Sequence, residues 1–171
     1  MKPRQILKGL FPNTPKPSIQ PDPSEARIHE RLTPLVDALA DPDDSRRRTA
    51  VEQVVRTCIP AVVGRLIERL VNMLGEGTSR GPALASLAGF GNRALPSLTL
   101  RFTRTRDPAL QSGIVEALTQ IAPGLPLAQR LDLMTEIMIL ARFAADESVS
   151  RALDRLVAVA RRATEAAART G

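Results

Sequence analysis

The side chains that could carry out catalysis are few in this chain. It has one histidine, His29, and one thiol, Cys58, so a Ser–His–Asp or Cys–His arrangement would have to use His29. A zinc site needs more His or Cys ligands than the sequence supplies. We interpret His29 as a surface residue of a first helix and Cys58 as a small buried apolar residue. We expect no cofactor and no metal.

Acidic pairs and glycine-rich stretches do not complete a reaction site either. Asp43 and Asp44 are adjacent, and adjacent residues on a helix point in different directions, so we interpret them as signals of a helix start. Glycines recur at 75–77 and at 89–91, but neither stretch has the preceding strand or the lysine of a phosphate-binding loop. The sequence therefore predicts a protein that is not an enzyme.

Arginine is the residue type whose distribution points to binding. No acid occurs between Gly77 and Arg106, a stretch that contains Arg93, Arg101 and Arg104. Arg101 and Arg104 are three positions apart and would share a helix face. We expect them to form a basic ridge with Arg93. An acidic protein surface or nucleic-acid phosphate could occupy such a ridge, and the alternative is solvated arginine over an aliphatic core.

Elements of helical period must position these side chains. Apolar residues recur at helical spacing, as at Leu110, Ile114, Leu118 and Ile121, and the alternation typical of strands is absent. Proline and aspartate mark where helices begin. These signals predict helices at 25–40, with a kink or a fresh start at Pro34, and at 42–57, 60–74, 79–90, 96–106, 108–121, 126–144 and from 147 onward.

Three of these helices carry specific expectations. Asp41-Pro42 and Asp107-Pro108 each predict a capping carboxylate followed by proline at the first helical position, and Asp146 should cap the last helix. Arg46–Arg48 are expected on an outer helix side. The helix at 126–144 is apolar on nearly all sides, which predicts burial on several faces.

Composition narrows the class of protein further. The chain has 171 residues, about one domain, and its aromatic content of 2% includes no Trp or Tyr, so the core must be aliphatic. No apolar run is long enough to span a membrane, and no secretory signal is evident. Together with the single cysteine, this leads us to expect a cytoplasmic protein.

Residues 1–24 differ from the remainder, which we assign to one domain at 25–171. This tail holds six of the fourteen prolines, favours extended backbone, and has a net charge of +3 from Lys2, Arg4, Lys8 and Lys16 against Asp22. Its apolar residues are Ile6, Leu7, Leu10 and Phe11. We predict an anchor in which these four enter a groove on a partner while Lys2 and Lys8 meet an acidic rim. A disordered tail and a targeting segment are the alternatives.

A period of about thirty residues connects the helices. The segments at 34–36, 41–42 and 50–54 match those at 96–98, 107–108 and 114–118, and weaker copies lie at 60–88 and 126–159. Helical hairpins repeated at this period are typical of an α-solenoid. The pattern resembles the HEAT-repeat family, in particular its short bacterial repeats. The resemblance implies an all-α solenoid of about four antiparallel helical hairpins.

The same resemblance implies a surface for a protein partner. Some relatives act on bilins or excise alkylated DNA bases, and a chain without Trp or Tyr is poorly equipped for base stacking. We therefore predict a non-enzymatic protein–protein interaction module, a small subunit or adaptor of a larger assembly whose binding surface is acidic. Binding of nucleic-acid phosphate is the alternative. The sequence leaves the oligomeric state open.

Overall fold

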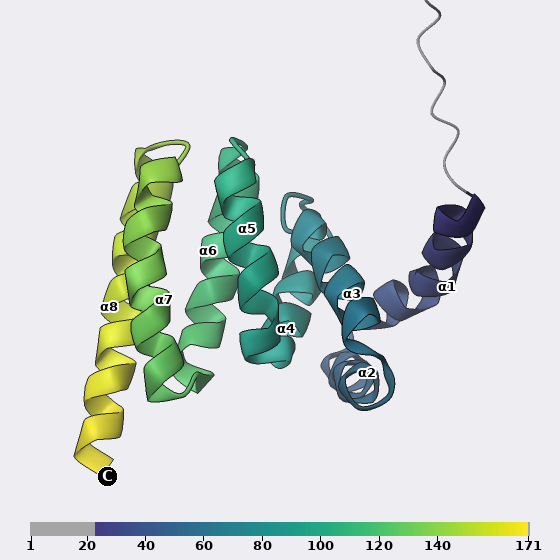
Figure 1. Cartoon of the computed structure of the whole chain (residues 1–171), viewed down its shortest axis with the longest axis horizontal. Coiled ribbons are helices and arrows are strands. Elements are labelled where there is room, and N and C mark those ends of the chain that lie inside the picture. The colour runs from purple at the N-terminus through teal and green to yellow at the C-terminus, as the bar shows by residue number, and fades with distance from the viewer. Residues whose placement is uncertain (1–22, 171) are drawn as a thin grey trace, which may run out of the picture.

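The fold is all-α over residues 23–170, the range that the computed structural model describes (Figure 1). Side chains are described for residue 30 and for 32–169. The α-helices are α1 Pro23–Leu39, α2 Asp44–Thr57, α3 Pro60–Met73, α4 Arg80–Phe90, α5 Leu95–Arg104, α6 Pro108–Ile121, α7 Leu127–Leu140 and α8 Glu147–Thr170. Short 3-10 turns follow three of them: η1 Gly91–Ala94, η2 Ala122–Gly124 and η3 Ala141–Phe143. The predicted tail anchor lies outside the described residues.

Consecutive helices pair into antiparallel hairpins, and the hairpins follow one another in chain order (Figure 1). Each odd-numbered helix contacts the next odd-numbered helix, and each even-numbered helix contacts the next even-numbered one. The result is two layers of helices enclosing one aliphatic core, with Phe90 and Phe102 as its fully enclosed aromatic side chains among the described residues. The all-α class is confirmed, and the order of contacts is the one expected for a solenoid of four hairpins.

Helix α6 lies at the centre of this core. It contacts α4, α5 and α8, and residues on most of its circumference are buried. At Gly113 a Cβ atom would lie 2.8 Å from both the Cβ and the carbonyl oxygen of Leu74, closer than real Cβ contacts allow. Only glycine therefore lets α6 approach the end of α3 this closely. A milder close approach occurs in the even layer, where a Cβ on Gly89 would lie 3.2 Å from Val51 Cγ1.

The helix starts agree with the proline and aspartate signals, with one correction. Asp107 accepts from the Ala109 N–H at 3.0 Å and α6 begins at Pro108, as predicted. The cap of α2, however, is Asp43, which accepts from the Arg46 N–H at 2.9 Å. Asp41 instead accepts from the Asp43 N–H at 2.8 Å, so Pro42 precedes the helix rather than opening it. Of the two alternatives expected at Pro34, a fresh start does not occur, because α1 continues through this residue.

The expectation that Arg46–Arg48 all face outward is wrong for Arg47. This side chain is buried, and its Nη1 donates to the carbonyl oxygen of Asp41 at 2.9 Å. Gln111 of α6 makes the corresponding hydrogen bond in the third hairpin, where its Nε2 donates to the Thr105 carbonyl at 3.1 Å. Both residues stand four positions after the capping aspartate and reach the carbonyl two positions before it. In both hairpins, a buried polar side chain thus donates a hydrogen bond to a backbone carbonyl in the turn that precedes the second helix.

Gln111 also joins the third hairpin to the fourth. Its Nε2 donates to the Phe102 and Phe143 carbonyls at 3.2 and 2.8 Å, and its Oε1 accepts from the Ala145 N–H at 2.7 Å. The side chain is fully buried. The amide therefore bonds through both its NH2 group and its oxygen, and it is a fixed part of the core.

We expect Gln111→Leu to lower the free energy of unfolding by about 2–4 kcal/mol, because it leaves buried backbone groups without partners. Chemical denaturation followed by circular dichroism measures this. The matched control is Gln120→Leu at an exposed position on the same helix, expected within about 0.5 kcal/mol of wild type. Equal stability of the two variants would contradict the assignment of Gln111 as an inter-hairpin link.

Asp146 caps α8, as its position before the last helix predicts. Its Oδ1 accepts from the Val149 N–H at 2.9 Å and from the Ser148 hydroxyl at 2.8 Å. The bond from Val149, followed by that from Ser148, lowers the pKa of Asp146 below its ordinary value of 3.8. A carboxyl with a lowered folded-state pKa stabilises the fold above its unfolded-state pKa and loses this effect as pH falls through the folded-state value.

We therefore expect Asp146→Ala to lower the melting temperature at pH 7, and the difference from wild type to shrink progressively below about pH 4. Thermal melts across this pH range measure the effect. The control is Asp154→Ala, which removes an exposed carboxylate of the same helix that does not cap it. A difference that stays constant down to pH 2 would show that the carboxylate hydrogen bonds are not its cause.

Candidate functional site

A groove between α3 and α5 contains two of the three predicted ridge arginines. Its volume is about 230 Å³. We call it the α3–α5 groove, and its lining residues are Glu68, Val71, Asn72, Ser97, Leu100, Arg101 and Arg104. The two helices are neighbours in the odd layer, and α5 presents residues 97, 100, 101 and 104 toward α3 because they recur every three or four positions.

The groove combines charge with apolar surface. Arg101 and Arg104 are exposed, and neither forms an ion pair with another described residue. Beside them, in the same groove, Leu100 keeps 49% of its surface exposed, although it is apolar. Glu68 and Asn72 on the opposite wall add an acceptor and an amide. Unpaired cations beside an exposed leucine suit a ligand that has both carboxylates and apolar side chains.

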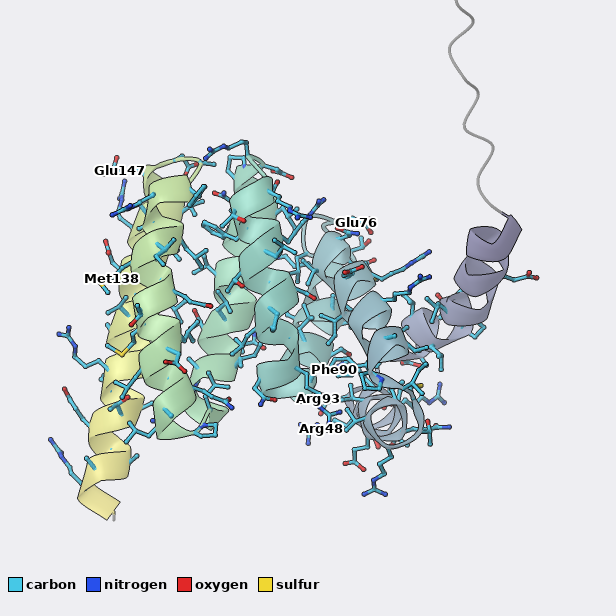
Figure 2. The ribbon with its side chains drawn as sticks, in the orientation of Figure 1. Arg48, Glu76, Phe90, Arg93, Met138 and Glu147 are labelled. Atoms are coloured by element: carbon cyan, nitrogen blue, oxygen red, sulfur yellow. The ribbon has the colours of Figure 1, made fainter. Side chains whose placement is uncertain are left out.

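Arg93 does not belong to this groove. It lies in η1, before α5 begins, and Figure 2 shows it near Phe90 at that end of the helix. Arg101 and Arg104 lie 8 and 11 positions further along, a distance of roughly 12–16 Å at helical rise. The expected single ridge therefore divides into a pair at one end of α5 and a separate residue at the other.

Two further arginines from the acid-free stretch hold hairpins together. Arg80 Nη2 of α4 bonds Glu116 Oε2 of α6 at 2.7 Å, which links the second hairpin to the third. Arg106 Nη1 donates to the Phe143 carbonyl at 3.1 Å, and its guanidinium lies 5.9 Å from the centre of the Phe143 ring. These contacts hold the hairpins together, so only some of the arginines in the acid-free stretch are available to bind a partner.

A second hollow lies in the even layer between α2 and α4. Its volume is about 400 Å³, and Ala85, Ala88 and Gly89 of α4 leave it open because their side chains are small. Arg47 and Arg48 line it from α2, but both already bond to Asp44, Arg48 at 2.7 Å. Glu52 also lines this hollow, so two carboxylates balance the two arginines, which makes the hollow a weaker candidate for an acidic ligand. Cys58 lies elsewhere, half-buried at the end of α2.

A third surface was missed by sequence reasoning. The expected burial of the 126–144 helix on several faces is wrong: Leu127 and Leu131 are 50% exposed, Met138 is 66% exposed and Ile139 is 52% exposed. Helix α7 packs against α5 and α8, and no described helix lies beyond it. Figure 2 shows Met138 on the side of α7 that faces away from α5. An apolar helix in a terminal hairpin has too few neighbours to cover it.

Comparison of this chain with protein-family models, with curated proteins and with solved structures finds no match. Within residues 23–170, no helix is long and apolar enough to cross a membrane. The same residues contain no group of three or more His, Cys, Asp or Glu side chains placed to hold a metal ion.

Proposed function

We propose that this protein is a non-enzymatic protein–protein interaction module, a small subunit or adaptor of a larger assembly. The observation that carries the proposal is the α3–α5 groove, where the exposed Leu100 lies beside two arginines that form no ion pair with another described residue. An exposed apolar side chain gains free energy when a partner covers it, and the arginines gain when they meet carboxylates. The HEAT-like arrangement of the hairpins supports the same function by analogy.

Binding of nucleic acid is the less favoured function. The Glu68 carboxylate lies in the same groove as Arg101 and Arg104 and would repel phosphate. Arg93 lies in η1, at the opposite end of α5 from the pair, which is too far away to extend the pair into a continuous track. A protein surface with one or two carboxylates and an apolar side chain fits this mixture better.

We expect the double substitution Arg101→Glu and Arg104→Glu to weaken partner binding at least tenfold, because it places like charges against an acidic surface. Nuclease-treated extract of the source cells is passed over immobilised protein, and retained proteins are quantified by mass spectrometry. Arg56→Glu, at an exposed position on α2, is the control. Proteins that bind wild type and the control but not the double variant are the expected partners.

The outcome that would contradict this function is binding to arbitrary DNA with a steep dependence on salt that the double variant abolishes. Counterion release would give that dependence if phosphates were the natural ligand. Retention of the same proteins by wild type and by the double variant would also exclude the groove as the binding surface.

The tail is the second part of the proposal. We expect deletion of residues 1–20 to leave the melting temperature unchanged, because the hairpins that build the core begin after it, and to weaken partner binding at least tenfold. The substitution of Leu10 and Phe11 by serine in the full chain tests whether the apolar residues are responsible. Unchanged affinity in a calorimetric titration with the purified partner would exclude the anchor.

A further inference from the structure

The exposed apolar residues of α7 form a regular pattern. Leu127, Leu131, Met134 and Met138 are separated by four, three and four positions, so they lie in one line along the helix. We call this line the end stripe. Three of its members are at least half exposed, and the fourth, Met134, is partly buried against the core. Stripes of this spacing are the contact surfaces of packed helices.

The end stripe lies where a further odd-numbered helix would pack. The α3–α5 groove shows which flank of each odd helix faces which neighbour: α3 presents Glu68, Val71 and Asn72 toward α5. The end stripe occupies the corresponding flank of α7, and Figure 2 shows Met138 pointing away from α5. This flank is more apolar than the flank of α3 that α5 already covers. Its composition is that of a covered surface rather than of a solvated end.

The charges on the part of α8 that extends beyond the start of the end stripe are mainly positive, and its arginines form no ion pair with another described residue. Helix α8 has 24 residues against 14 in α7, and Figure 1 shows its C-terminal end extending past the start of α7. That extension carries the exposed residues Arg161, Arg162 and Arg169 against Glu165, and none of the three arginines forms an ion pair with another described residue. Arg151, by contrast, is paired with Glu147 at 3.3 Å.

A buried cation lies beside the end stripe as well. Arg130 is on α7, one turn from both Leu127 and Met134, and is only 7% exposed. Its Nε atom is buried without a hydrogen-bond partner. A nearby carboxylate would lower the free-energy cost of burying this charge.

From this pattern we infer that the end stripe binds an amphipathic helix of a partner protein, with apolar residues in matching spacing and acidic residues on its flanks. The helix would lie along α7 and add to the odd layer as its next member. Two other occupants fit the charges less well. A second copy of this chain would bring its own arginine-rich α8 against this one, and the tail at 1–24 has a net charge of +3.

The inference rests on the proposed interaction function but uses a different surface. A synthetic helical peptide serves as the probe, with leucines in the 4-3-4 spacing, glutamates on both flanks and one tryptophan. Because the chain has no Trp or Tyr, the fluorescence of that tryptophan reports binding directly. We expect the glutamate peptide to bind at least tenfold more tightly than the same peptide with lysine flanks, and this ratio to fall as salt is added.

Two matched variants of the full chain locate the site. Leu131→Gln with Met138→Gln should weaken binding of the glutamate peptide at least tenfold, whereas Ile139→Gln should not. Ile139 is 52% exposed, close to the 50% of Leu131, but is turned by about 100° from Met138 around α7. All three substituted positions are on the surface, so circular dichroism melts should confirm an unchanged fold.

Three results would overturn the inference: no binding of either peptide, equal affinity for both peptides, or binding that the double variant retains. Light scattering that shows a dimer of the wild-type chain, dissociated by the double variant, would assign the end stripe to a second copy instead. If the peptide fails while the Arg101 and Arg104 substitutions still abolish partner capture, the interaction function stands and only this surface is excluded.

Discussion

The close packing of α6 is the constraint on which the rest of the structure depends. This helix lies between α4 and α8 in the even layer and under α5 in the odd layer. Its polar side chains therefore either lie on the exposed side, as Glu116 and Gln120 do, or bond within the core, as Gln111 does. Gly113 provides the space for the end of α3, and Gln111 satisfies carbonyls from two hairpins. The apolar residues of the other helices become a continuous core only because α6 is placed this closely among them.

The helix positions could be predicted because proline and aspartate restrict where a helix begins. The register of the repeat could not be read from the Asp-Pro pairs alone. Asp41 and Asp107 are 66 positions apart, whereas the matching stretches at 50–54 and 114–118 are 64 apart, as are the true caps Asp43 and Asp107. The spacing of 64 positions is therefore the one that correctly aligns the first hairpin with the third. It also aligns Arg47 with Gln111, the two buried polar residues whose role in the turns the apolar pattern did not predict.

The binding surfaces were predictable only where one helix contains them. Spacing placed Arg101 and Arg104 on one face, and they do line one groove. Arg93 was assigned to the same ridge although it precedes the predicted helix at 96–106, because a row of charges in sequence does not show how far apart its members lie in space; Arg93 lies in η1, before α5. The exposure of α7 was missed for a related reason. Hydrophobic periodicity reports which side chains favour burial, but the number of neighbours depends on the place of a hairpin in the row.

The arrangement of hairpins in chain order has a consequence for how the protein forms. The main helix contacts join elements within one hairpin or in adjacent hairpins. Contacting residues are therefore close in sequence, and chains with such a low contact order fold rapidly because little loop-closure entropy opposes each step. When a hairpin leaves the ribosome, the preceding hairpin that it packs against has already been synthesised. Synthesis from the N-terminus can thus be followed by assembly in the same direction, one hairpin at a time, and the core is complete only when α7 and α8 cover the remaining face of α6.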